Sequence, residues 1–289
     1  MSSTQNEIAI SIVLPCYNEE NAILAVVNEI ENALKTTPLN CYEIIVIDDC
    51  STDTSADVIK KSNIILIKNL ERRGAGYSRR KGIEKSRGKI IITLDADGSY
   101  SPQDIPKLLS FFPEYDEVIG QRSCDHGNYK FLRLFIKKLI FIFTSIIVGS
   151  YIPDLNTGLR AFKRKVVIKH LNLIPNGFSC ASTLSLIYIC LGYKVKFVPI
   201  EYKERIGNSK FHPLLDTARL ILTVIRITLK LSPYRILFLF MFMVSFMVFS
   251  KVITWALFNI LIFFIFKIYI KPKPDKDSSG ETNEIESNL

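Results

Sequence analysis

The chain has 289 residues, 48% of them hydrophobic, and carries a formal charge of +9. Its length suffices for one α/β domain of ordinary size plus an appendage. The positive charge indicates an anionic partner. Because the basic residues flank aliphatic helices and do not alternate with aromatic side chains, the composition favours a lipid surface over nucleic acid.

The cysteine pattern indicates a reduced compartment. The six cysteines form no Cys-x-x-Cys pair and no metal-ligand spacing, and the three scattered histidines argue against a zinc site. The first sixteen residues lack the basic-then-apolar layout of a secretory signal. We therefore expect a catalytic domain that faces the cytosol.

The first half of the chain alternates apolar strands with helices. Strands are expected at residues 8–14, 43–47, 64–67, 90–94 and 117–120. Helices are expected at residues 22–34, from about 54, at 77–85 and from 102. This alternation predicts an α/β fold with a mostly parallel, doubly wound sheet.

Acidic side chains follow three of these strands. They are Glu19, Asp48, Asp49, Asp95 and Asp97. Ligands bind beyond the carboxyl ends of parallel strands, so these residues predict a binding crevice at one edge of the sheet. Two neighbouring carboxylates repel each other, and Mg²⁺ or Mn²⁺ bound by them and by substrate phosphates would relieve that cost. A solvated acidic turn at Asp97-Gly98 is the alternative interpretation.

The second half is expected to contain two amphipathic helices, at residues 129–149 and 214–231. Each has a narrow polar sector on an otherwise aliphatic surface. The sectors hold Lys130, Arg133, Lys137 and Thr144 in the first helix, and Asp216, Arg219, Thr223, Arg226 and Lys230 in the second. Such a stripe is typical of a helix that lies in the membrane interface. Two core helices of a larger soluble domain are the alternative.

Further elements are expected between these helices. They are a turn entering a short strand at 154–162, an apolar helix at 179–191, a strand at 193–202 and a basic loop at 205–210.

Residues 236–270 are almost all apolar, with an interruption at Lys251. A single helix of this length would reach about 50 Å, more than a hydrocarbon core of about 30 Å. Basic residues flank both ends, which favours a membrane hairpin of two short helices with both ends in the cytosol. One span followed by an interfacial helix is the alternative. The tail after Lys271 is expected to be disordered.

Basic residues near the crevice or on the membrane-facing elements indicate a second bound anion. They are Arg122, Arg133, Lys137, Arg205 and Lys210. If the protein catalyses a transfer reaction, an acceptor that is both anionic and membrane-embedded is a lipid phosphate. Such a phosphate is ionised near neutral pH, so no strong general base is needed to deprotonate it. The protein would align donor and acceptor and neutralise charge. Headgroup anchoring is the alternative role, and we prefer it for Lys130 and Lys138.

Five motifs occur in order between about residues 8 and 212. They are Pro15-x-Tyr17-Asn18-Glu19, Asp48-Asp49-x-Ser51-x-Asp53, Asp95-Ala96-Asp97, Gly120-x-Arg122 and Arg205-x-Gly207-x-Ser209-Lys210. Together they resemble family 2 glycosyltransferases, in particular polyprenyl-phosphate glycosyltransferases such as dolichol-phosphate mannose synthases. The resemblance implies a GT-A catalytic domain, a nucleoside-diphosphate-sugar donor with Mg²⁺ or Mn²⁺, and inverting transfer to undecaprenyl or dolichyl phosphate.

The resemblance also implies site residues. The nucleoside pocket would comprise Pro15, Tyr17, Glu19, Ile47 and Asp49. The metal and diphosphate contacts would be Asp95 and Asp97, with the backbone of Ala96, and Ser99 stands where mannose synthases commonly carry a glutamine ligand. Phosphate-binding side chains would be Arg122, Arg133, Arg205 and Lys210, and we infer the same role for Lys137.

The expected organisation is a nucleotide-sugar-binding core at 1–128, an acceptor half at 129–232, a transmembrane hairpin at 233–271 and a disordered tail at 272–289. Whether the protein forms a homo-oligomer stays open. Two other functions also stay open: a processive polysaccharide synthase, and a catalytically silent membrane protein that binds nucleotide sugar. The synthase motif Gln-x-x-Arg-Trp is missing, since the only tryptophan is Trp255 in the hairpin.

Overall fold

The computed structural model describes residues 8–35, 37, 41–60, 64–122, 141–177, 179–203, 213–248 and 252–269. Within these residues, one sheet has the strand order β3-β2-β1-β4-β6-β5-β7. The strands are β1 (Ile10–Cys16), β2 (Tyr42–Asp48), β3 (Ile65–Lys68), β4 (Ile90–Thr93), β5 (Glu117–Arg122), β6 (Arg160–Lys163) and β7 (Val195–Ile200).

The sheet is mostly parallel, as predicted. Strands β3, β2, β1 and β4 run parallel to one another, and β7 runs parallel to β5. The exception is β6, which lies antiparallel between β4 and β5. A short strand was expected there, but its direction and its place inside the sheet were not. The sheet is therefore mixed, with one reversed strand in fifth place of seven.

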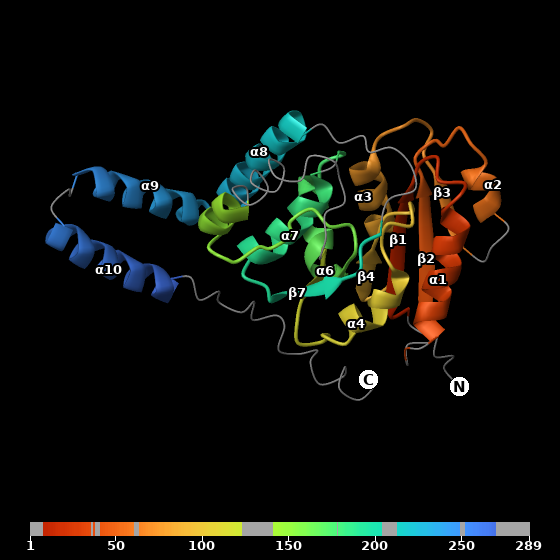
Figure 1. The fold of residues 1–289 in the computed structure, drawn as a ribbon, viewed down its shortest axis with the longest axis horizontal. Coiled ribbons are helices and arrows are strands. Elements are labelled where there is room, and N and C mark those ends of the chain that lie inside the picture. The colour runs from red at the N-terminus through yellow and green to blue at the C-terminus, as the bar shows by residue number, and fades with distance from the viewer. Residues whose placement is uncertain are drawn as a thin grey trace.

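Helices cover both faces of the sheet (Figure 1). They are α1 (Ile23–Lys35), α2 (Ser55–Ile59), α3 (Ala75–Lys85), α4 (Ile105–Leu109), α6 (Arg164–Val167), α7 (Cys180–Cys190), α8 (Pro213–Leu231), α9 (Pro233–Val248) and α10 (Val252–Tyr269). Two 3₁₀ helices, η1 (Pro102–Asp104) and η2 (Ile168–Leu173), precede α4 and follow α6. Each element predicted in the described part of the first half is present, with ends shifted by a few residues.

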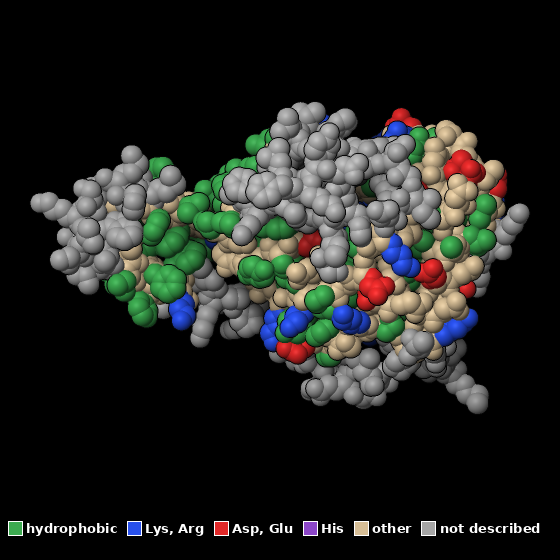
Figure 2. Space-filling model, viewed as in Figure 1, with side chains coloured by type: hydrophobic (Ala, Val, Ile, Leu, Met, Phe, Trp, Pro, Cys, Tyr) green, Lys and Arg blue, Asp and Glu red, His purple; other side chains and the backbone are tan. Residues whose placement is uncertain are grey.

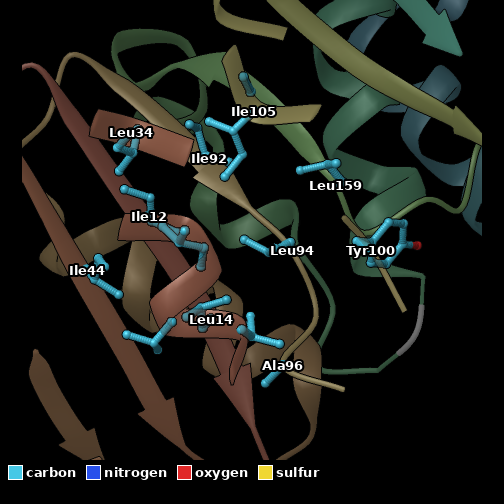
Figure 3. Close-up of a cluster of buried hydrophobic side chains, with 14 of the residues drawn as sticks. Ile12, Leu14, Leu34, Ile44, Ile92, Leu94, Ala96, Tyr100, Ile105 and Leu159 are labelled. Atoms are coloured by element: carbon cyan, nitrogen blue, oxygen red, sulfur yellow. The ribbon is translucent and has the colours of Figure 1, made fainter. Parts of the chain in front are cut away.

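Side chains of β1 alternate between two hydrophobic clusters. Ile12 and Leu14 pack with α1 and α4, whereas Val13 packs with α3 and α7. This alternation follows from the two-residue period of a strand, and helices on both faces explain why β1 is apolar throughout. Figure 3 shows the first cluster continuing along β4 to Ala96 and Tyr100, so the core reaches the loop that carries the paired aspartates.

A third cluster joins the helical segment 141–148 to α7 and α8. The outer face of α8 exposes Arg219, Arg226 and Lys230, as predicted. The prediction for Thr144 is wrong. Thr144 is fully buried and Ile142 points outward, because the helical segment turns its Thr144 side toward the rest of the protein. The remainder of the first amphipathic helix lies outside the described residues.

Helices α9 and α10 extend side by side away from the sheet (Figure 1). The rings of Phe238 and Phe266 stack between them with centroids 4.1 Å apart. No helix built from the described residues is long and apolar enough to cross a membrane, so the membrane-spanning hairpin is not confirmed. The predicted tail lies outside the described residues, and the proposed domain boundaries stay predictions.

Candidate functional site

The loops after β1, β2 and β4 form the predicted acidic edge. Cys16 pairs in register with Asp48, so the first two loops leave the sheet at the same level. They are joined by hydrogen bonds from Asn18 N to Ser51 Oγ (3.0 Å) and from Asn18 Nδ2 to Thr52 Oγ1 (3.1 Å). The edge is therefore built from loops that hold one another in place.

The two aspartates after β4 lie in different environments. Asp95 pairs with Arg79, whose Nη2 lies 2.5 Å from Asp95 Oδ1. Asp97 is 5% exposed, and its Oδ1 accepts hydrogen bonds from Ser99 N (3.1 Å) and Ser99 Oγ (2.6 Å). Ala96 between them is buried in the core, which fixes the loop. Arg79 was not among the predicted site residues.

These oxygens suit a hard divalent cation, which binds one or two carboxylates and completes its shell with water and substrate phosphates. Asp97 and Ser99 provide oxygens at one point, and Asp95 follows the same strand. No group of three or more His, Cys, Asp and Glu side chains in the described part of the chain could hold a metal ion. The residues therefore fit a cation that is held jointly with a phosphorylated ligand, and not a closed protein site.

The residues predicted for the nucleoside pocket differ in how accessible they are. Tyr17 is half-buried, and the guanidinium carbon of Arg72 lies 4.1 Å from its ring centroid. Glu19 is also half-buried at this edge. Pro15 and Ile47 are buried neighbours in the sheet, and Ile47 is fully buried near Gly82 of α3. The Ile47 side chain therefore packs against α3, and its part in a nucleoside pocket stays a prediction.

Asp49 organises the loop that enters α3. Its carboxylate accepts hydrogen bonds from Asn69 Nδ2 (2.7 Å), Arg73 N (3.0 Å), Gly74 N (2.7 Å) and Ser78 Oγ (3.2 Å). Two of these donors are backbone amides just before or at the helix N-terminus, where such groups lack partners within the helix. The visible role of Asp49 is thus to hold the loop that brings Arg72 over Tyr17.

Arg122 lies on the same side of the molecule as Asp97. A bridge between Tyr100 and Tyr202 and a hydrogen bond from Lys203 N to Ser99 O (2.9 Å) connect the two regions. The guanidinium carbon of Arg122 lies 5.3 Å from the Tyr202 ring centroid. These contacts bring Arg122 near the loop of the paired aspartates, and its role in phosphate binding stays a prediction.

Asp154 is a partner of Arg122 that the sequence did not reveal. Arg122 Nε and Nη2 donate to the two oxygens of Asp154 at 2.8 and 2.9 Å. Burial lowers the pKa of Arg122, but the hydrogen bonds and charge of Asp154 more than offset it, and the pKa is raised overall. The arginine therefore stays charged. The other predicted cations, Arg133, Lys137, Arg205 and Lys210, lie outside the described residues.

The loop before β6 closes the site beside Asp95. Gly158 N donates to Tyr100 Oη (2.7 Å), and a Cβ at Gly158 would stand 2.6 Å from Asp95 Oδ2. A larger residue would therefore displace Asp95 or Tyr100. The spacing of these residues in sequence gave no signal for this contact.

An apolar cavity of about 660 Å³ opens at the residues that precede Arg122 and Asp154 in the chain. Gln121 and Pro153, the neighbours of Arg122 and Asp154 in the chain, are part of its lining. The other lining residues are mainly apolar and include Phe141, Ile142, Ile146 and Tyr151. We call this cavity the apolar groove. The groove is thus one residue away in the chain from both members of the Arg122–Asp154 pair.

Comparison with known proteins places this architecture in a family. Residues 11–171, more than half of the chain, match the model of glycosyl transferase family 2. The chain belongs to that family. The resemblance of the motifs is confirmed, and the protein is a glycosyltransferase.

Relatives of this glycosyltransferase come from archaea and bacteria. An uncharacterised protein of Methanocaldococcus jannaschii is 31% identical over 68% of this chain and 82% of its own length. A dolichyl-phosphate hexose transferase of Haloferax volcanii is 25% identical over 76% of this chain and 94% of its own length. An undecaprenyl-phosphate 4-deoxy-4-formamido-L-arabinose transferase of Pseudomonas fluorescens is 28% identical over 71% of this chain. The chain spans 61% of that protein's length.

Solved structures share the fold of this glycosyltransferase. Glucosyl-3-phosphoglycerate synthase from Mycobacterium tuberculosis, in complex with Mn²⁺, uridine diphosphate and glucosyl-3-phosphoglycerate, superposes with a TM-score of 0.60. It is 18% identical, over 76% of this chain and 80% of its own. Mannosyl-3-phosphoglycerate synthase from Rubrobacter xylanophilus has a TM-score of 0.57 at 21% identity, over 77% of this chain and 73% of its own. The predicted GT-A type of catalytic domain is thus confirmed.

Proposed function

We propose that this glycosyltransferase moves a sugar from a nucleoside-diphosphate sugar to a polyprenyl phosphate at the cytosolic face of a membrane. The reaction depends on Mg²⁺ or Mn²⁺ and inverts the anomeric carbon. The observation that carries the proposal is the apolar groove lined by Gln121 and Pro153, the chain neighbours of Arg122 and Asp154, because an acceptor with a phosphate head and an isoprenoid chain needs both a cation and an apolar surface. The names of the relatives from Haloferax volcanii and Pseudomonas fluorescens point to the same acceptor class.

The donor would lie along the acidic edge. Tyr17 and Glu19 would line the nucleoside pocket, and Asp97 with Asp95 and Ser99 would hold the divalent cation. When bound, that cation supplies positive charge against the diphosphate leaving group. Mn²⁺ and uridine diphosphate in the complex of the Mycobacterium tuberculosis synthase support this choice of ligands.

The acceptor phosphate would bind at Arg122. Asp154 takes Nε and Nη2 of the guanidinium and so fixes its plane. Arg133, Lys137, Arg205 and Lys210 would complete the anion site. A phosphate oxygen is already ionised near neutral pH, so the chain needs only to orient it for attack opposite the leaving group.

The outer surface of the helical half supports contact with a membrane. On α8, Arg219, Arg226 and Lys230 are exposed beside Leu222 and Leu229, which are 65% and 48% exposed. Figure 2 shows hydrophobic side chains gathered over α9 and α10 at one end of the molecule. A basic stripe next to exposed leucines is typical of a helix that lies in a lipid interface. The cytosolic location follows from the flanking basic residues of the apolar C-terminal segment.

The direct test is transfer by the purified full chain. The protein is incubated with MnCl₂, a panel of UDP- and GDP-sugars, and undecaprenyl or dolichyl phosphate, and lipid products are analysed by mass spectrometry. One sugar per lipid phosphate is expected. A polymer would indicate a processive synthase, and no glycolipid from any donor and acceptor pair would refute the proposal.

A groove variant tests where the lipid binds. Ile146→Glu places a charge in the apolar groove and is expected to raise the KM for polyprenyl phosphate by about tenfold, since a lost apolar contact of this size costs about 1.4 kcal/mol. The control is Leu24→Glu, at an exposed leucine on α1. Equal KM values for the two variants would show that the groove is not part of the acceptor site.

A further inference from the structure

Arg79 is a buried cation at the acidic edge of the sheet. It lies on α3 and is only 4% exposed. Its Nη2 pairs with Asp95 Oδ1 at 2.5 Å, and its Nη1 lies 2.8 Å from Sγ of Cys180, the first residue of α7. A buried guanidinium is expensive unless it is paired, so a specific contact with the loop after β4 has to offset the cost.

Asp95 is confined on its other side as well. A Cβ at Gly158 would stand 2.6 Å from Asp95 Oδ2 and 2.9 Å from Tyr100 Cε2. The carboxylate therefore lies between Arg79 and the loop before β6, with its side chain 39% exposed. Position and charge of Asp95 are both set by groups from other elements.

The ion pair between Arg79 and Asp95 lowers the net negative charge that the two aspartates present to a cation. Asp95 and Asp97 together carry two negative charges, and Arg79 cancels one of them. We propose that Arg79 is a positioning residue that neutralises Asp95, so that a divalent cation binds mainly through Asp97 and becomes tightly held only when the donor diphosphate adds its own charge. This inference rests on the metal dependence in the proposed function. It makes metal binding and donor binding one coupled event.

A purely structural ion pair would behave differently, and the chain provides one for comparison. Arg87 Nε and Nη2 contact Glu43 Oε2 at 3.0 and 2.9 Å. Glu43 lies at the start of β2, whereas the aspartates follow the end of β4, so the two pairs lie at opposite edges of the sheet. Arg87→Met is thus a control that removes an exposed arginine from a buried carboxylate far from the site.

The test measures binding of Mn²⁺ alone, without nucleotide, from the electron paramagnetic resonance signal of the free ion. Arg79→Met is expected to bind Mn²⁺ about tenfold more tightly than the wild type, because an uncompensated neighbouring charge shifts such equilibria by at least that factor. Addition of UDP or GDP should tighten Mn²⁺ binding less in this variant than in the wild type. The kcat of Arg79→Met should fall, because Asp95 loses the ion pair that holds it in position. Arg87→Met should match the wild type in all three measurements.

Two further variants make the outcome decisive. Arg79→Met/Asp95→Asn removes one charge of each sign and should return Mn²⁺ affinity to near the wild-type value. Arg79→Gln keeps a hydrogen-bonding head and should also bind Mn²⁺ more tightly, which covers the case in which Arg79→Met fails to fold. Unchanged or weaker Mn²⁺ binding in a folded Arg79 variant overturns the inference. Unchanged Mn²⁺ binding in Asp97→Asn contradicts the metal role itself, a separate failure of the proposed function.

Discussion

The acidic edge of the sheet and the helices α8–α10 depart from ordinary protein surfaces in opposite ways. At the edge, charged groups are buried: Asp48, Asp97 and Arg79 are 2%, 5% and 4% exposed. On the helices, apolar groups are exposed: Leu222 and Phe240 are 65% and 63% exposed. Buried charge needs a partner of opposite charge, and exposed apolar surface needs a non-aqueous one. At the edge the partners lie partly within the protein, as Asp95 does for Arg79, whereas the exposed apolar surface of the helices suits the proposed lipid or the membrane.

The largest effect is expected at Asp97. Asp97→Asn keeps the size of the side chain and its hydrogen bond from Ser99 but removes the charge that would hold the cation. The rate of transfer should fall about a thousandfold, or about 4 kcal/mol of transition-state stabilisation. The measurement is kcat/KM for the donor, with Asp57→Asn on the exposed surface of α2 as control. A variant with near-normal turnover would show that the buried charge at the edge has a structural role only.

The second effect concerns the pair between Arg122 and Asp154. Asp154→Asn leaves a guanidinium that is 16% exposed without its carboxylate. Removing one partner of a buried pair costs about 3 kcal/mol or more, which should appear in the free energy of unfolding by denaturant. Asp57→Asn, which breaks an exposed pair with Lys60, should cost less than about 1 kcal/mol. Equal costs would mean that Arg122 finds water or another acceptor when Asp154 is lost.

The third effect tests the helical surface. Arg219→Gln/Arg226→Gln should weaken binding to vesicles that contain anionic lipid by about 2 kcal/mol, at about 1 kcal/mol for each charge. Binding to neutral vesicles should change little, and so should the melting temperature. Lys60→Gln/Lys85→Gln removes two exposed charges elsewhere and serves as the control. Similar losses in both double variants would reduce the role of α8 to general positive charge.

The smallest effect is a pH dependence at the opposite edge. Burial raises the pKa of Glu43, but hydrogen bonds from Ser11 and Arg87 more than offset this and lower it below its usual value of 4.5. A lowered pKa in the folded state contributes stability above pH 4.5, and this contribution is lost as the pH falls through the lower folded value. The melting temperatures of the wild type and Glu43→Gln should therefore differ at pH 7 and converge below pH 4.5. A difference in melting temperature that does not change with pH would show that the charge of Glu43 does not stabilise the fold.

Much of the fold could be predicted from local sequence. The runs of Ile and Val in β1, β2 and β4 and the helical spacing in α1 carry their own signals, and acidic residues directly after strands indicate one edge of the sheet. Pairings between distant residues could not be predicted. The place of β6 depends on contacts such as Ile92 with Ala161, and Arg79 reaches Asp95 only after the fold is formed. Thr144 was misassigned because its hydroxyl was counted as a sign of exposure.

The direction of β6 has a consequence for the way this enzyme can vary. Thr93, at the end of β4, pairs with Arg160, at the start of β6, so the segment that precedes β6 arrives at the catalytic edge. A parallel strand would have delivered it to the far side. Changes in residues 151–158 would therefore reach Arg122 through Asp154 and Asp95 through Gly158, while the loops after β1 and β2 belong to other parts of the chain.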